Sequence, residues 1–379
     1  MKKYFFSITI FIIAVFCIVF PQDMIAATKS GLTLWYNVIV PSLLPFLILS
    51  DLITKSALPY LFGKLFAPVM KILFHLPGVS SIAVFLGMTG GYPIGAKTTA
   101  DLLKNNAISQ NAANHLITFV NNSGPLFILG AIGIGLYQNT TIGLLLLLSH
   151  YLAAFFTGFL FRFFKKETES QTTASSPIRF EVIRLSKLSG ILTETIKHSI
   201  QLICVIGGFI LTFSIFSAIL EKTGILLLLS KILFPKIETQ TSYSILTGLL
   251  EVTNGVNKVA TLSIPLLYKL IITSMLVSFA GFSIHMQTLS VLSDTNISFL
   301  RYLTGKIIQS LFSGMITWLF LWKTNFSTLL TTSVVATTPA YTESEINLIL
   351  SVILTLLLFS SIFKIFQIHF LQKKKNPPY

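Results

Sequence analysis

Stretches of apolar residues long enough to cross a lipid bilayer constrain this chain more than any other feature. A helix of about 20 apolar residues crosses the hydrocarbon core of a membrane, and backbone polar groups in lipid are satisfied only inside helices or closed barrels. Of the 379 residues, 53% are hydrophobic and 11% are charged, which is not typical of a soluble domain. We therefore predict an all-α polytopic membrane protein. The expected spans are residues 4–20, 32–53, 113–137, 140–164, 191–220, 266–292, 299–322 and 346–371.

Two further stretches, about 80–104 and 242–262, begin apolar and then become polar. They are too interrupted to be ordinary spans, so we expect two re-entrant helical hairpins, each of which enters and leaves on one side of the membrane. An amphipathic stretch precedes each hairpin, at residues 58–76 and 225–235.

The same series of elements occurs in both halves of the chain. In each half, a span, an amphipathic stretch and a hairpin are followed by two more spans, so residues 32–164 and 191–322 are expected to form two repeats. Lys97 and Lys258 lie at matching places in the two hairpins. Apolar segments interrupted at corresponding positions of two halves are the best sequence indicator of a transporter's binding site.

The basic residues predict the orientation of the chain. Its formal net charge is +14, but no aromatic-interleaved basic patch accompanies that charge, which argues against nucleic acid as a partner. In a membrane protein, Lys and Arg gather on the cytoplasmic side, and their distribution here places both termini in the cytoplasm. The first repeat then begins outside and the second inside, so the two repeats are predicted to be inverted.

The segments outside the repeats carry no chemical motif. Residues 1–31 are expected to form a first span and an external linker. Two lysines before an apolar run resemble a signal peptide, but Ile25 is a poor residue near a cleavage site, which favours an uncleaved span. Residues 165–190 have no apolar stripe and are expected to form a polar cytoplasmic linker. Residues 323–379 comprise an external loop and a last span with a basic tail.

Four polar segments interrupt the apolar helices, at residues 90–97, 121–125, 251–258 and 280–287. Non-helical backbone at membrane depth is tolerated only where it is buried in protein or lines a wet cavity. In the second segment, glycine and proline permit an unwound turn, and the start of the half-helix that follows is a natural seat for an anion. We expect the substrate site between the two hairpins and the two broken spans. The candidate substrate-binding residues are Gly91, Tyr92, Pro93, Gly95, Lys97, Asn121, Asn122, Ser123, Gly124, Glu251, Asn254, Asn257, Lys258, Ser283 and Gln287.

Each of these segments also has a structural interpretation. The two asparagines before a kink at Pro125 can join neighbouring helices, and glycines spaced four apart can form a ridge that lets helices approach closely. Lys97 and Lys258 can extend to a polar face of the membrane. Glu251 either pairs with Lys258 or couples transport to H⁺ or Na⁺.

No catalytic or cofactor-binding motif accompanies these segments. His115, His150 and His285 are scattered along apolar segments, so a hydrogen bond is favoured over a metal ion for each. Cys17 and Cys204 lie in apolar stretches and imply no disulfide. The chain shows no nucleophile elbow and no paired catalytic carboxylates. We expect a protein that is not an enzyme and that needs no cofactor.

Four motifs occur in the order typical of a known family. They are Pro41-Ser42-Leu43-Leu44-Pro45-Phe46, Gly91-Tyr92-Pro93-Ile94-Gly95-Ala96-Lys97, Asn122-Ser123-Gly124-Pro125-Leu126-Phe127 and Gly281-Phe282-Ser283. From about Trp35 to Trp322, the chain resembles the sporulation integral membrane proteins of the YlbJ type, which belong with the nucleoside-recognition Gate domain proteins. The resemblance implies a fold similar to concentrative nucleoside transporters, with inverted repeats and re-entrant hairpins.

The resemblance also implies a function, which is transport of dipicolinic acid across the outer forespore membrane of a sporulating bacterium. Half-helix N-termini, Asn and Ser donors, a lysine and Tyr92 suit this flat aromatic dianion, and they equally suit a nucleoside or another small molecule carried by the same fold. A third hypothesis is a non-transporting membrane scaffold that binds partners through residues 165–190. The expected partners are a small-molecule anion and the lipid bilayer. A coupling ion (H⁺ or Na⁺) and a homo-oligomer are compatible with the sequence.

Overall fold

The computed structural model describes residues 2–164 and 185–323, all of which belong to the first of two compact units, residues 1–330 and 331–379. The described residues form helices joined by short connections and contain no strand, as predicted for an all-α protein. The predictions for residues 165–184 and 324–379, among them the span 346–371, lie outside the described residues.

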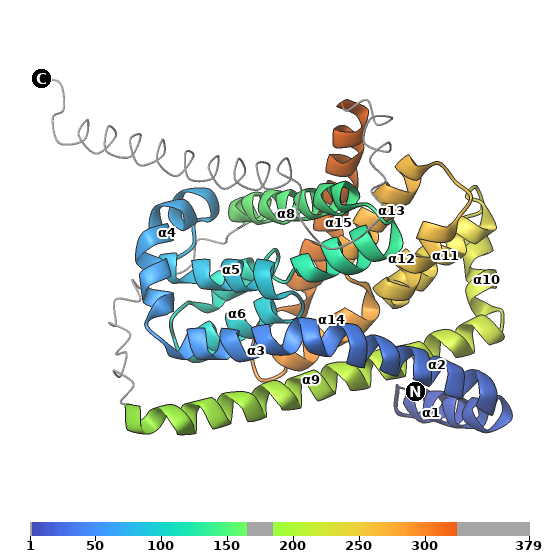
Figure 1. Ribbon diagram of the computed structural model, residues 1–379, viewed down its shortest axis with the longest axis horizontal. Helices are drawn as coiled ribbons and strands as arrows, with labels where there is room; N and C mark the ends of the chain where they lie inside the picture. Colours follow the sequence, from blue (N-terminus) through green and yellow to red (C-terminus); the bar gives the residue numbers. More distant parts are fainter. Residues whose placement is uncertain (1, 165–184, 324–379) are drawn as a thin grey trace, which may run out of the picture. The chain divides into compact units, whose positions relative to one another are not determined.

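The helices follow one another closely along the described chain (Figure 1). Two stretches of π-helix, Trp35–Ile39 and Leu126–Leu136, and two short 3₁₀ helices, Gly78–Ser80 and Arg162–Phe164, occur among the described residues. The α-helices are α1 (Lys2–Val19), α2 (Pro21–Leu34), α3 (Val40–Lys55), α4 (Leu58–Phe74), α5 (Ser81–Gly90), α6 (Ile94–Lys104), α7 (Gln110–Leu116), α8 (Thr140–Phe161), α9 (Leu185–Lys222), α10 (Ile225–Leu233), α11 (Thr239–Leu250), α12 (Val252–Thr261), α13 (Leu266–Phe279), α14 (Gly281–Leu292) and α15 (Phe299–Lys323).

Several described helices are long and apolar enough to cross a membrane. Three candidates meet this requirement alone, and the number becomes five if each of two bent helix pairs is one span. The pairs bend by 108° between α1 and α2 and by 83° between α3 and α4. The three are Thr140–Phe164, Ser189–Lys222 and Leu266–Leu292.

Two of the predicted spans are not among these candidates. Residues 113–137 fold as the end of α7, an unwound stretch and the π-helix Leu126–Leu136. The helix α15 replaces the predicted span 299–322, but it carries Arg301, Lys306 and Gln309. In the second half, α9 begins at Leu185, inside the segment predicted as a polar linker.

Each predicted hairpin consists of two helices that pack against each other. The helices α5 and α6 are joined by a short turn, and α11 and α12 are joined at Glu251. Glycines permit the close approach in both pairs. A Cβ atom placed at Gly87 would lie 3.0 Å from the Cα of Gly95, and one placed at Gly255 would lie 2.0 Å from the Cα of Gly248.

The turn of each hairpin packs against a break in a later helix. The chain leaves the helical path between α7 and the second π-helix, and there a Cβ atom placed at Gly91 would lie 3.0 Å from the amide nitrogen of Gly124. Between α13 and α14, Ala280 and Gly281 have φ angles of 82° and 76°. A Cβ atom placed at Gly281 would lie 3.2 Å from the amide nitrogen of Val252. The same contact therefore occurs once in each half of the chain.

Apolar contacts hold each hairpin in place. One buried cluster joins α3, α5, α6 and α7 and includes Phe119, whose ring stacks on Phe74 with 4.9 Å between the centroids. A second cluster joins the π-helix Leu126–Leu136 with α12 and α13 and includes Val256 and Leu270. Close van der Waals packing of these side chains holds the polar turns in position.

Replacement of Gly255 by alanine is expected to destabilise the protein, because the added methyl group meets the backbone of Gly248. Overpacking of this kind costs about 1–3 kcal/mol. Gly208 is a matched control, since it lies inside α9 and a Cβ atom there meets nothing within 4 Å. Gly208→Ala should be neutral or stabilising by up to about 1 kcal/mol. Thermal unfolding of the purified protein in detergent measures both changes, and equal midpoints would contradict the close packing of α11 on α12.

Candidate functional site

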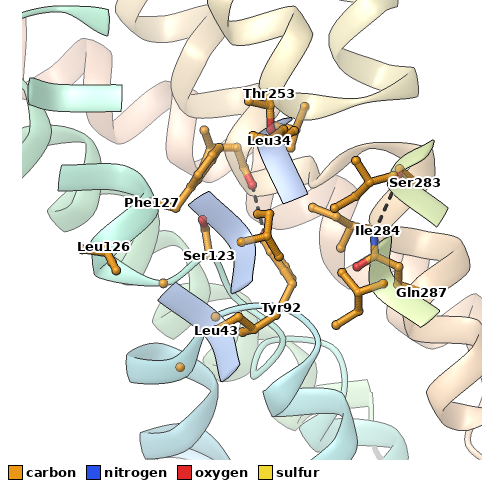
Figure 2. Close-up of a pocket in the computed structure, with 18 of the residues that line it drawn as sticks. Leu34, Leu43, Tyr92, Ser123, Leu126, Phe127, Thr253, Ser283, Ile284 and Gln287 are labelled. Carbon is orange, nitrogen blue, oxygen red and sulfur yellow. Dashed lines mark hydrogen bonds between the residues drawn. The ribbon is translucent and has the colours of Figure 1, made fainter. Parts of the chain in front are cut away.

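A cavity of about 100 Å³ lies where the two hairpin turns and the two broken helices come together (Figure 2). All four polar segments indicated by the sequence contribute to its walls. Apolar side chains of α2, α3 and α9 complete the lining. The lining residues from the four segments are Gly90, Gly91, Tyr92, Ser123, Gly124, Glu251, Val252, Thr253, Ser283, Ile284 and Gln287.

Tyr92 is the largest polar side chain of the cavity wall. Figure 2 shows it in the middle of the view, with Ser123 on one side and Ile284 and Gln287 on the other. Its hydroxyl group donates a hydrogen bond of 3.0 Å to the carbonyl oxygen of Val277. Tyr92 therefore ties the first hairpin turn to α13, close to the break in that span.

A few polar groups stand among apolar side chains in the remaining wall. The amide of Gln287 donates to the hydroxyl of Ser283 at 3.4 Å, one turn away on α14. The facing residues Leu43, Phe127 and Ile206 are apolar. Apolar walls with a small number of placed polar groups are typical of sites for small molecules.

Glu251 is the charged residue of the cavity lining. It is 4% exposed, and its two carboxylate oxygens accept the backbone N–H groups of Thr253 at 3.1 Å and Asn254 at 2.7 Å. The carboxylate therefore caps the N-terminus of α12, where the helix dipole favours negative charge. The alternative pairing of Glu251 with Lys258 is not observed, because the ammonium of Lys258 lies 3.3 Å from Glu221.

Asn121 and Asn122 lie behind the break and do not line the cavity. Both are fully buried. The amide of Asn121 donates to Thr288 at 3.0 Å, and the amide oxygen of Asn122 accepts from Gln309 at 2.8 Å. These side chains brace the unwound segment against α14 and α15, and that they bind a substrate stays a prediction. Ser123, the next residue, does line the cavity.

His150 holds the unwound segment from α8. The backbone N–H of Ser123 donates to Nε2 of His150 at 3.1 Å, so Nε2 is an acceptor. Nδ1 then carries the proton and donates to the hydroxyl of Ser278 at 2.7 Å. This neutral histidine joins the breaks of both halves. In the described part of the chain, no group of three or more potential ligands could hold a metal ion.

Lys97 belongs to an ion-pair network outside the cavity. Its ammonium lies 2.9 Å from Asp51 and 2.8 Å from Asp101. The Asp51 side chain is 7% exposed and also contacts Lys55 at 2.9 Å and the hydroxyl of Thr195 at 2.6 Å. The network ties α6 to α3 and α9, and a role of Lys97 in substrate binding stays a prediction.

The structure thus separates the predicted site residues into two groups. Seven of them meet in the cavity wall: Gly91, Tyr92, Ser123, Gly124, Glu251, Ser283 and Gln287. The others lie outside the lining: Pro93, Gly95, Lys97, Asn121, Asn122, Asn254, Asn257 and Lys258. Gly95 packs on the backbone of Val120, and Asn257 is exposed. That the seven bind a substrate stays a prediction.

Sequence reasoning missed Lys306 on α15. This lysine is 1% exposed, and its ammonium donates to the side-chain oxygen of Gln309 at 2.7 Å. It also lies 5.1 Å from the centroid of the Tyr92 ring. A lysine and a glutamine three residues apart share one helix face. That spacing inside an apolar span is the signal that could have indicated the pair.

Helices of spanning length around an internal cavity define a multi-pass integral membrane protein. The chain is 35% identical, over 321 residues, to the sporulation integral membrane protein YlbJ of Bacillus subtilis (strain 168), and the match covers 80% of this chain and 78% of that protein. The chain therefore belongs to the YlbJ family of sporulation integral membrane proteins. No protein-family model and no solved structure matches it.

Asp51→Asn is expected to destabilise the protein, because it removes a buried carboxylate that Lys55 and Lys97 share. Breaking a buried ion pair costs about 3–5 kcal/mol, and the remaining contact of Lys97 with Asp101 should hold the loss near the lower end. Glu194→Gln is the control, since Glu194 is 58% exposed and 3.9 Å from Lys55, and it should cost under about 1 kcal/mol. Denaturant unfolding measures both. Unchanged stability of the Asp51 variant would show that the network does not hold α6.

Proposed function

We propose that this chain is a membrane transporter of a small organic anion, and that its substrate is dipicolinic acid, carried across the outer forespore membrane during sporulation. Membership of the YlbJ family supports the role in sporulation. The transport role and the substrate rest on the cavity and on the resemblance described above.

The observation that carries the proposal is the position of the cavity at four breaks in apolar helices. Each break interrupts backbone hydrogen bonds, which is costly in a membrane protein unless the freed groups meet protein or a polar cavity. In transporters, substrate sites are formed by such discontinuous helices. A scaffold protein has no comparable need for interrupted helices around an internal space.

Matching contacts in the two halves support a pair of inverted repeats with re-entrant hairpins, similar to concentrative nucleoside transporters. Each hairpin turn packs against a later helix break, as described above. Each hairpin is also tied by a lysine of its second helix to an acidic residue near the end of a preceding long helix. Lys97 meets Asp51 of α3, and Lys258 meets Glu221 of α9. In this arrangement, both chain termini are cytoplasmic.

The chemistry of the cavity suits a flat aromatic acid. Apolar side chains can cover the ring, and Ser123 and Gln287 offer hydrogen-bond donors. The volume of about 100 Å³ is smaller than the roughly 300–1,000 Å³ of sites for drug-sized ligands. An aromatic substrate therefore requires the walls to move apart, as alternating access between the two sides of a membrane also requires.

A nucleoside is the second candidate substrate, and one observation favours it. The charged residue of the lining, Glu251, is acidic, whereas the other polar lining groups are neutral hydroxyls and amides. Such groups suit a neutral ribose and base. The scaffold hypothesis gains no comparable support, and most of the linker on which it depends lies outside the described residues.

Removal of the Glu251 charge distinguishes these substrates. For an anion, Glu251→Gln should raise the affinity about five- to thirty-fold, which corresponds to roughly 1–2 kcal/mol for two like charges about 8–16 Å apart at an effective dielectric constant of about 20. The new amide oxygen can still accept a hydrogen bond from the N-terminus of α12. For a nucleoside, the affinity should change little. Isothermal titration calorimetry with dipicolinate and with uridine, on purified protein in detergent, measures both.

The control for this titration is Glu194→Gln, which removes an exposed acidic charge that does not line the cavity. It should leave both affinities unchanged. Binding of uridine without binding of dipicolinate would replace the first candidate by the second. Binding of neither compound would contradict both.

A further inference from the structure

Lys306 is a buried lysine that has no acidic partner among the described residues. It is 1% exposed and is among the largest fully buried side chains. Its ammonium contacts the side-chain oxygen of Gln309 at 2.7 Å and the hydroxyl of Tyr92 at 3.4 Å, both of which are uncharged. Among the described residues, no carboxylate lies within ion-pair distance of it.

Three other lysines of the described chain have acidic partners. Lys55, Lys97 and Lys258 each lie within 4 Å of at least one carboxylate, although all three are more exposed than Lys306. Removing an ammonium from water is costly unless a charge partner or several hydrogen bonds replace the water. A buried lysine without an acid is a candidate functional position in a membrane protein. A ligand that carries negative charge would supply the missing partner.

The hydrogen bonds around Lys306 fix where its ammonium points. Gln309 donates to Asn122 at 2.8 Å, which leaves the other end of its amide, the oxygen, facing Lys306. Asn122 belongs to the unwound segment whose next residues line the cavity. Gln309 therefore fixes the ammonium of Lys306 near the cavity, and the hydrogen bond to Asn122 fixes Gln309 in turn.

Tyr92 contacts this lysine and also lines the cavity. Its ring lines the cavity and occupies the middle of Figure 2, while Lys306 lies 5.1 Å from the centroid of the same ring. The hydroxyl of Tyr92 is held by its hydrogen bond to the carbonyl oxygen of Val277. Loss of that hydrogen bond would let the ring turn and would open the ammonium to the cavity.

We propose that Lys306 supplies the positive charge that binds a carboxylate of the substrate, and that Tyr92 covers this charge until the substrate displaces it. The inference deepens the proposed function and rests on it. It assigns the recognition of charge to a residue of α15 in place of Lys97 and Lys258, whose ammonium groups are already paired. Glu251, on the second hairpin, then disfavours a second anion in the same cavity.

The test compares pyridine-2,6-dicarboxylate with its neutral diamide. Lys306→Met keeps the length of the side chain and removes its charge, and replacement of a buried charge by an apolar group of similar size is usually tolerated. The variant should lose at least about tenfold in affinity for the dicarboxylate, as expected for a hydrogen bond between charged groups. Its affinity for the diamide should stay as in the wild type. Lys104→Gln, at an exposed lysine paired with Asp294, is the control and should change neither affinity.

A second variant tests the position of Tyr92 and leaves Lys306 in place. Tyr92→Ala uncovers the ammonium, so the preference for the dicarboxylate over the diamide should be kept or should increase. An unchanged preference in the Lys306 variant, or a preference abolished by Tyr92→Ala, would overturn the inference while dicarboxylate binding by the wild type still supports the proposed function. If the wild type binds uridine and no carboxylate, both the proposed function and the inference are wrong.

Discussion

Unwound backbone inside a bundle of apolar helices is the constraint on which the rest of this structure depends. Such backbone has no water to bind, so each break must be enclosed by other parts of the protein. In the first half, the hairpin turn at Gly91 packs against the break at Gly124. In the second half, the break at Gly281 packs against the hairpin turn at Glu251. A side chain at any of these glycines would separate the breaks, and the cavity between them would lose its walls.

The charged residues follow from this arrangement. Lys97 and Lys258 pair with Asp51 and Glu221 and anchor the hairpins to long helices, at a distance from the cavity lining. Among the described residues, Lys306 has no such partner, and its ammonium contacts Tyr92. The ion pairs thus position the hairpins, whereas Lys306 is the residue that, in our proposal, a carboxylate of the ligand contacts. This division explains how a strongly basic chain can present an almost neutral cavity.

Glycine and proline, which act locally on the backbone, indicated three of the breaks in the sequence, and the change from apolar to polar residues indicated the turn at Glu251. The sequence also predicted both hairpins, and seven of its candidate substrate-binding residues line the cavity. It did not predict that Asn122 accepts a hydrogen bond from Gln309, or that Lys306 contacts Tyr92, because these partners are far apart in the chain. The apolar length of residues 113–137 also predicted one continuous span, whereas the unwound turn divides this stretch into two helical segments. Which side chains become hydrogen-bond partners depends on how the helices pack together, and local sequence patterns carry no information about that packing.

Uptake by liposomes tests most directly whether the cavity at the four breaks is the path of a transported acid. Ser283→Trp would fill the cavity from α14, whereas Ile200→Trp places the same ring on an exposed position of α9. Liposomes that contain the wild type or the Ile200 variant should accumulate radiolabelled dipicolinate, and those with equal amounts of folded Ser283 variant should not. Equal uptake by the Ser283 variant and the wild type would contradict the assignment of the cavity.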